Sequence, residues 1–189
     1  MVTKIAVFAS GSGSNFQAIQ EAIHCGKLDA KIELVVTDKP SAFVVSRAEN
    51  FGIPVYAFSA KNFESKSSYE AEIVAKLSEL NVEWIVLAGY MRLIGHTLLS
   101  AFPNRIVNIH PSLLPSFPGK DAIGQAMAHG VKVTGVTVHL VDEGMDTGPI
   151  LAQAAVEVVD GNREKTEARI HAVEHELYTK TLKKLFETK

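Results

Sequence analysis

Asn108-Ile109-His110-Pro111-Ser112-Leu113-Leu114-Pro115 is the stretch that organises this chain. The apolar run from Ile106 to Ile109 is typical of a short buried strand. Side chains two residues apart on a strand point to the same face, so we expect Asn108 and His110 to project together. Pro111 has no N–H to donate to a strand ladder, which predicts that the strand ends before it. A carboxamide and an imidazole at the carboxyl end of a strand are typical of a site at the open edge of an α/β sheet.

Asn108 and His110 also fit a plainer interpretation, in which both are hydrogen-bonded core residues. Two neighbouring features favour a functional site instead. The stretch continues into a Pro-rich segment, and an acidic, glycine-flanked segment follows downstream at residues 142–149, DEGMDTGP. That segment offers an acidic partner for the pair.

Strand and helix patterns alternate on both sides of this stretch. The patterns predict strands at residues 4–9, 30–37, 55–58, 84–88, 106–109, 133–141 and 150–158. They predict helices at residues 16–25, 41–51, 67–80, 96–102, 121–129 and 165–187. Such alternation predicts one doubly wound α/β domain, with a mostly parallel sheet and helices on both faces, and it leaves strand directions in the last third open.

Composition and charge narrow the class of protein. At 189 residues the chain fits one domain, which would bury about 70% of the surface of its unfolded form. The net charge is −2 and no basic block is present, which argues against a nucleic-acid or membrane-surface partner. One cysteine, Cys25, excludes an intrachain disulfide framework. With no signal-peptide pattern and no apolar run of membrane length, we expect a soluble cytoplasmic protein.

A glycine-rich loop, Ser10-Gly11-Ser12-Gly13-Ser14-Asn15, follows the first predicted strand. Gly11 and Gly13 let the backbone approach a ligand without clashes from a Cβ atom. Ser14 and Asn15 are good N-cap residues for the helix that follows. Free N–H groups and a helix dipole together predict an anion site, and a terminal monophosphate is the favoured ligand.

Two alternatives compete with the phosphate loop. A dinucleotide fingerprint would read G-x-G-x-x-G, but the third position here is Phe16. Asp38, at the end of the second predicted strand, keeps this alternative open because a ribose-binding acid would lie there. The other alternative is an ordinary Gly-rich turn without a ligand.

A further candidate pocket follows the strand predicted at residues 84–88. Gly89-Tyr90-Met91-Arg92-Leu93-Ile94 would line a pocket for a flat apolar ligand, although ordinary core packing with one surface arginine explains the composition equally well. The stiff apolar segment from Leu113 to Phe117 would wall the same pocket.

These segments together resemble the phosphoribosylglycinamide formyltransferases of the folate-dependent formyltransferase family. The resemblance covers nearly the whole chain, in the family's order and spacing, and rests on Gly11–Asn15, Gly89–Arg92, Asn108–Pro115 and Asp142–Pro149. It implies a Rossmann-like formyltransferase fold. It also implies transfer of formyl from 10-formyltetrahydrofolate, a co-substrate, to the amine of 5-phosphoribosylglycinamide in purine (IMP) biosynthesis. The N-terminal half would bind phosphate, and the C-terminal half would bind folate and hold the catalytic residues.

The residue types suit that chemistry. When an amine attacks a formyl carbon, an oxyanion develops that needs donors. Asn108 can donate through its amide, and a protonated His110 can donate with full charge. A carboxylate can relay the proton from the attacking nitrogen to the departing one. The resemblance assigns that role to Asp146.

The resemblance also implies binding residues. Those for the ribonucleotide are Gly13, Ser14, Asn15 and Glu174, and those for the folate are Lys66, Met91, Arg92, Leu93, Ile94 and Asn108. Glu174 lies on the apolar face of the last predicted helix and needs a partner there, so a paired structural glutamate is the alternative. Lys66 stands where the family has an arginine, and it keeps the charge without the bidentate fork. His139 is either a support for the pocket or a structural histidine.

The sequence leaves three rival functions open. Methionyl-tRNA formyltransferase and formyltetrahydrofolate hydrolase would each need an extra domain. A nucleotide-binding regulatory module would use the Gly loop alone and leave Asp146 unexplained. We expect no metal, because His171 and His175 are four residues apart without an evident third ligand. A homodimer is an open possibility.

Overall fold

A computed structural model describes residues 2–187 of the chain. The strands form one sheet in the order β3-β2-β1-β4-β5-β6-β7. In chain order they are β1 (Thr3–Phe8), β2 (Ala30–Thr37), β3 (Val55–Ala57), β4 (Trp84–Leu87), β5 (Ile106–His110), β6 (Val133–Leu140) and β7 (Ile150–Glu157). The helices are α1 (Ser14–His24), α2 (Phe43–Asn50), the 3-10 turn η1 (Ala60–Asn62), α3 (Lys66–Glu79), α4 (His96–Ala101), α5 (Ala122–Ala128) and α6 (Arg163–Glu187). The predicted α/β class with a mostly parallel sheet is confirmed.

The fold divides after Val107 into two compact units. The prediction that residues 1–189 form one domain, with a phosphate-binding and a catalytic half, stays a prediction. In the part of the chain that the structure describes, no helix has the length and apolar character needed to cross a membrane.

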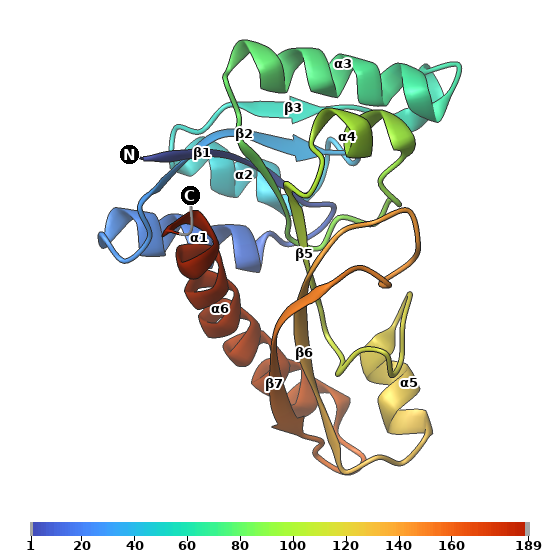
Figure 1. The fold of residues 1–189 in the computed structure, drawn as a ribbon. Helices are drawn as coiled ribbons and strands as arrows, with labels where there is room; N and C mark the ends of the chain where they lie inside the picture. The colour runs from blue at the N-terminus through green and yellow to red at the C-terminus, as the bar shows by residue number, and fades with distance from the viewer. Residues whose placement is uncertain (1, 188–189) are drawn as a thin grey trace. The chain divides into compact units, whose positions relative to one another are not determined.

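The first unit is a parallel βαβ arrangement. β1 pairs in parallel with β2 and β4, and β2 pairs in parallel with β3. Crossovers between parallel strands are right-handed, so α1 and α2 lie on one face and α3, which leads back to β4, lies on the other (Figure 1). The β1 side chains from Ile5 to Phe8 are fully buried, as a strand covered on both faces requires. Each such large apolar side chain contributes about 1.5–3 kcal/mol through its burial.

The second unit is built on an antiparallel pair. β6 and β7 pair antiparallel, with a register shift between Val138 and His139. α6 packs along these strands, and its Ile170, Tyr178 and Leu182 are buried (Figure 1). The strand direction that the sequence left open is therefore antiparallel here, and the segment between the two strands carries Asp146.

Side-chain caps explain why two helices begin earlier than predicted. Ser65 accepts the N–H of Ser68 (3.1 Å), so α3 begins at Lys66. Asn162 accepts the N–H of Lys165 (2.9 Å), so α6 begins at Arg163. Each cap satisfies a helix N–H that has no acceptor within the helix.

Candidate active site

The second unit brings four polar side chains together. β5 ends at His110, immediately before Pro111, as the sequence predicts. Asn108 is half-buried and His110 is buried at the end of this strand. His139 on β6 and Asp146 in the following segment complete the cluster. Strand alternation and the β6–β7 pair thus place on one side of the unit residues that are far apart in sequence.

Backbone chemistry determines which nitrogen of His110 carries a proton. Nε2 lies 2.9 Å from the carbonyl oxygen of Phe117, and a carbonyl can only accept, so Nε2–H donates. Nδ1 is then the nitrogen that exchanges a proton, and it lies 3.5 Å from Oδ2 of Asp146. This separation exceeds an ordinary hydrogen bond but lies within the range of a close ion pair.

Asp146 is held in an uncommon backbone conformation. Its φ is +57°, a left-handed value that costs a non-glycine residue about 1–2 kcal/mol. Oδ2 accepts the N–H of Gly119 at 2.7 Å, and Oδ1 lies 3.8 Å from Nε2 of His139. Strained residues of this kind persist where the surroundings hold them and are concentrated at functional sites.

His139 orients the amide of Asn108. Nδ1 of His139 donates to the carbonyl oxygen of Leu140 at 2.8 Å. In the neutral ring Nε2 is then an acceptor, and it receives an N–H from Nδ2 of Asn108 at 3.2 Å. Burial lowers the pKa of His139, which favours this neutral form. The sequence left His139 open between support and structure, and the contact makes it a direct support of Asn108.

A Pro-rich loop, residues 111–120, supplies the backbone partners of this cluster. The Phe117 carbonyl binds His110, and the Gly119 N–H binds Asp146. Phe117 has a φ of +54°, a rare conformation for a bulky residue. One short loop therefore holds both His110 and Asp146.

Sequence reasoning missed the side chains that anchor this loop. Thr137 on β6 donates to the carbonyl of Ser112 (2.7 Å) and accepts the N–H of Leu114 (3.0 Å). Gln153 on β7 donates to Thr137 (3.0 Å) and to the Leu114 carbonyl (2.9 Å). Gln125 on α5 binds the other end of the loop. The partners of Thr137 and Gln153 are distant in sequence, so no local pattern marks these two residues. Those of Gln125 lie five and seven positions away.

In the first unit, the expected cap of the glycine loop is wrong. Gly13, not Ser14 or Asn15, is the N-cap of α1, and no side chain caps this helix end. Gly13 has a φ of +74°, and a Cβ there would meet Cγ2 of Val44 at 2.7 Å. Only glycine fits both constraints without strain, so Ser14 and Asn15 lie inside the first turn instead.

The loop carbonyls turn toward α2. Val44 N–H donates to the Gly11 carbonyl (3.1 Å), and Nε of Arg47 donates to the Ser12 carbonyl (2.8 Å). In a planar trans peptide the next N–H points the opposite way from the carbonyl. The N–H groups of Ser12 and Gly13 therefore point away from α2.

Asp38 has protein partners on both carboxylate oxygens. Oδ1 accepts from the Ser10 hydroxyl (2.5 Å), and Oδ2 pairs with Nε of Arg92 (2.9 Å). The same Ser10 hydroxyl accepts the N–H of Met91 (2.9 Å). The ribose-binding role considered for Asp38 is thus replaced by a structural one, in which it holds the segment after β4.

The segment from Met91 to Ile94 presents apolar side chains. Met91 and Leu93 are 60% and 54% exposed, whereas Ile94 is buried. The following Gly95 N–H donates to the buried carboxylate of Glu70 (2.7 Å). Lys66 is exposed at the start of α3, and its Cε lies close to the position that a Cβ on Gly95 would occupy.

Glu174 is buried on α6, as its place on the apolar face predicts. Oε2 of Glu174 accepts from Nδ1 of His171 at 2.8 Å. This hydrogen bond raises the pKa of His171. No group of three or more His, Cys, Asp or Glu side chains within residues 2–187 is arranged to hold a metal ion.

Comparisons with known proteins agree on one family. A formyl transferase family model matches residues 3–182. The phosphoribosylglycinamide formyltransferase of Bacillus subtilis (strain 168) is 55% identical over 183 residues, which are 96% of this chain and 94% of that protein. The trifunctional purine biosynthetic protein adenosine-3 of Drosophila melanogaster is 41% identical, and the match covers 95% of this chain and 14% of that protein. The crystal structure of glycinamide ribonucleotide transformylase 1 from Geobacillus kaustophilus has a TM-score of 0.95 and 57% identity, covering 98% of this chain and 99% of that one.

Proposed function

Because the chain belongs to the formyl transferase family, we propose that it transfers formyl from 10-formyltetrahydrofolate to the amine of 5-phosphoribosylglycinamide. The products are the N-formyl ribonucleotide and tetrahydrofolate, formed in purine biosynthesis. Similarity to relatives named for this reaction supports the substrates. The observation that carries the proposal is the His110–Asp146 pair, 3.5 Å apart and adjacent to Asn108.

Asn108 and His110 stabilise the developing oxyanion. One N–H of the Asn108 amide is engaged by His139, and the other donates to the oxygen of the formyl group. His110, protonated on both nitrogens, donates through Nδ1 while Nε2–H stays on the Phe117 carbonyl. Two donors set in place before the reaction need little reorganisation as charge develops, and each is worth roughly 10²–10³ in rate.

Asp146 handles the proton in the same reaction. The substrate amine forms a bond to the formyl carbon and acquires positive charge. Asp146 accepts a proton from that nitrogen, directly or through water. The bond between the formyl carbon and the folate nitrogen then breaks, and a proton returns to the departing nitrogen. Oδ2 of Asp146 faces His110, so the carboxylate also stabilises the imidazolium.

Binding roles follow from the chemistry of each segment. In the first unit, the loop containing Gly13, Ser14 and Asn15 binds the substrate phosphate through N–H groups at the start of α1. Met91 to Ile94 bind the folate, for which the exposed side chains of Met91 and Leu93 provide apolar contact.

Three further binding roles complete the proposal. Asn108 also contacts the folate, because it holds the formyl oxygen. Lys66 binds the anionic folate tail as a point charge. In the second unit, Glu174 accepts from the glycinamide amine or amide. A soluble cytoplasmic enzyme is the expectation that accompanies these assignments.

A product assay tests the proposed function. The purified chain is incubated with 10-formyltetrahydrofolate, with and without phosphoribosylglycinamide, and both products are followed by mass spectrometry. The expected result is stoichiometric tetrahydrofolate and N-formyl ribonucleotide only when the acceptor is present. Tetrahydrofolate release without acceptor would indicate a hydrolase. Formyl transfer to methionyl-tRNA, supplied in a separate incubation in place of phosphoribosylglycinamide, would indicate methionyl-tRNA formyltransferase. Asp146→Asn is the control for catalysis by this site.

A further inference from the structure

We propose that Gln125 on α5 is a positioning residue for Asp146 and acts through the peptide that joins Pro118 to Gly119. The inference rests on the proposed function, in which Asp146 carries the reacting proton. Gln125 lies outside the cluster of Asn108, His110 and Asp146 and does not touch Asp146 itself. Its influence passes through one planar group.

The Gln125 side chain holds the carbonyls on both sides of Gly119. Nε2 donates to the Pro118 carbonyl and to the Lys120 carbonyl, each at 2.9 Å. Carbonyl oxygens only accept, so the amide must present its NH₂ group, and both of its hydrogens are used. The orientation of the amide is therefore determined by its partners.

The Pro118 carbonyl and the Gly119 N–H belong to the same peptide unit. In a trans peptide they point in opposite directions within one plane. When Gln125 draws the carbonyl to one side, the N–H is turned to the other, where Oδ2 of Asp146 accepts it at 2.7 Å. Gln125 thereby directs the donor that sets the position of the Asp146 carboxylate.

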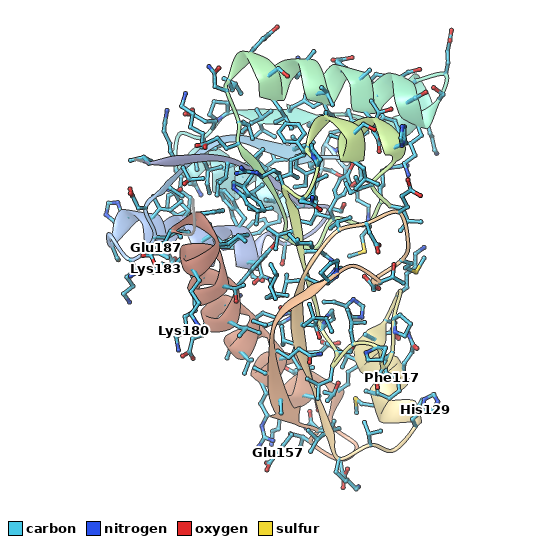
Figure 2. All side chains as sticks on the ribbon, in the orientation of Figure 1. Phe117, His129, Glu157, Lys180, Lys183 and Glu187 are labelled. Carbon is cyan, nitrogen blue, oxygen red and sulfur yellow. The ribbon has the colours of Figure 1, made fainter. Side chains whose placement is uncertain are left out.

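The local backbone needs such support. Phe117 and Asp146 have positive φ values, of +54° and +57°, which are strained for residues other than glycine. Strained conformations persist only where neighbouring contacts hold them. The C-cap residue of α5, His129, contacts this region at a second point, because its ring centroid lies 5.2 Å from that of Phe117, both labelled in Figure 2. Residues of α5 and its C-cap therefore hold this part of the loop in place.

Gln125→Met removes both donated hydrogen bonds and keeps the length and helix propensity of the side chain. We expect kcat to fall about tenfold with little change in KM for either substrate, because misplacement of a catalytic group lowers turnover without removing binding contacts. Gln153→Met is the matched comparison. It also removes two donated hydrogen bonds, one to the Leu114 carbonyl of this loop and one to Thr137 on β6, and neither involves the Pro118–Gly119 peptide.

A second readout does not depend on turnover. The amide proton of Gly119 donates to a carboxylate, so its NMR chemical shift should follow the titration of Asp146 in the wild-type chain. Gln125→Met should reduce that response, and Gln153→Met should leave it intact.

The inference would be overturned if Gln125→Met had the wild-type kcat and its Gly119 amide-proton shift followed Asp146 as in the wild-type chain. Equal losses in both readouts from Gln153→Met would also overturn it, because the effect would then be general loop anchoring. If the wild-type chain transfers no formyl group but its Gly119 response depends on Gln125, the proposed function fails while the positioning role stands.

Discussion

Nδ1 of His110 lies 3.5 Å from Oδ2 of Asp146, and each residue has one backbone partner within the three residues 117–119. The pair is therefore held by a single short segment rather than by two independent supports. A change that moves this segment should disturb both residues together.

Asp146→Asn tests the pair most directly. It preserves size and some hydrogen bonding but removes the charge, so kcat should fall by about 10²–10⁴-fold with the fold intact by circular dichroism. His110→Asn should be comparably severe. The double variant should lose much less than the product of the single losses, because residues that act as a unit are non-additive. Near-normal turnover of Asp146→Asn would reject the catalytic assignment, and strictly multiplicative losses would reject the coupling.

Gly13→Ala tests the glycine loop. The added Cβ would lie 2.7 Å from Val44 at a φ of +74°, so the free energy of unfolding should fall by about 1–3 kcal/mol. Ribonucleotide affinity should weaken more than folate affinity. Gly11→Ala is the control for the stability effect, since a Cβ there meets no protein atom within 4 Å and its φ is not positive. Equal loss of both affinities, measured by calorimetry on folded protein, would contradict the phosphate assignment.

The dependence of stability on pH should carry a contribution from His139. Burial lowers the pKa of His139 from 6.5, so below pH 6.5 the unfolded state binds more protons than the folded state. The free energy of unfolding should therefore increase as pH rises through the window just below 6.5. It should decrease again as pH falls through that window. Urea unfolding of wild type and His139→Gln would measure it, and the variant should show the shallower slope.

His171 serves as the comparison, because its pKa shifts in the opposite direction to that of His139. Its hydrogen bond to Glu174 raises its pKa above 6.5, so its stabilising contribution is present below pH 6.5 and is lost as pH rises through the folded-state pKa. His171→Gln should leave the slope below pH 6.5 unchanged. Identical slopes for wild type and His139→Gln in that window would contradict the assignment to His139.

Asp38→Asn tests the anchor of the segment after β4. Ser10 can still donate to the remaining oxygen, but the pairing with Arg92 loses its charge. We expect KM for the formyl donor to rise roughly tenfold, corresponding to about 1.4 kcal/mol, with kcat nearly unchanged. Asp160→Asn is the control, because its pair with Lys132 is 71% exposed on the Asp side and exposed pairs contribute about 0–1 kcal/mol. A fall in kcat at constant KM would contradict this role.

Metal removal should leave turnover unaffected. The proposed steps use the amide of Asn108, the imidazole of His110 and the carboxylate of Asp146. Activity measured after exhaustive chelation should equal that of untreated protein. Recovery that depends on added metal would reject this mechanism.

The sequence alone determined the features that depend on local patterns. Alternating strand and helix periods indicated the α/β class, and Pro111 marked the end of β5 correctly. The two-residue period of a strand placed Asn108 and His110 on one face. The glycine-flanked acidic segment indicated an acidic partner downstream, and the family resemblance assigned that role to Asp146. These inferences succeed because strand periodicity and proline chemistry act within a few residues of the chain.

Only the tertiary structure decided which backbone and side-chain groups meet across long separations. It made Gly13 rather than Ser14 the N-cap, because Val44 closes the space beside Gly13. It paired Asp38 with Arg92 across 54 positions of the chain. It also set β6 and β7 antiparallel and directed Gln153 to the Leu114 carbonyl, 39 positions away. Hydrogen bonds and steric limits of this kind depend on distances in space, and local propensity and periodicity do not encode them.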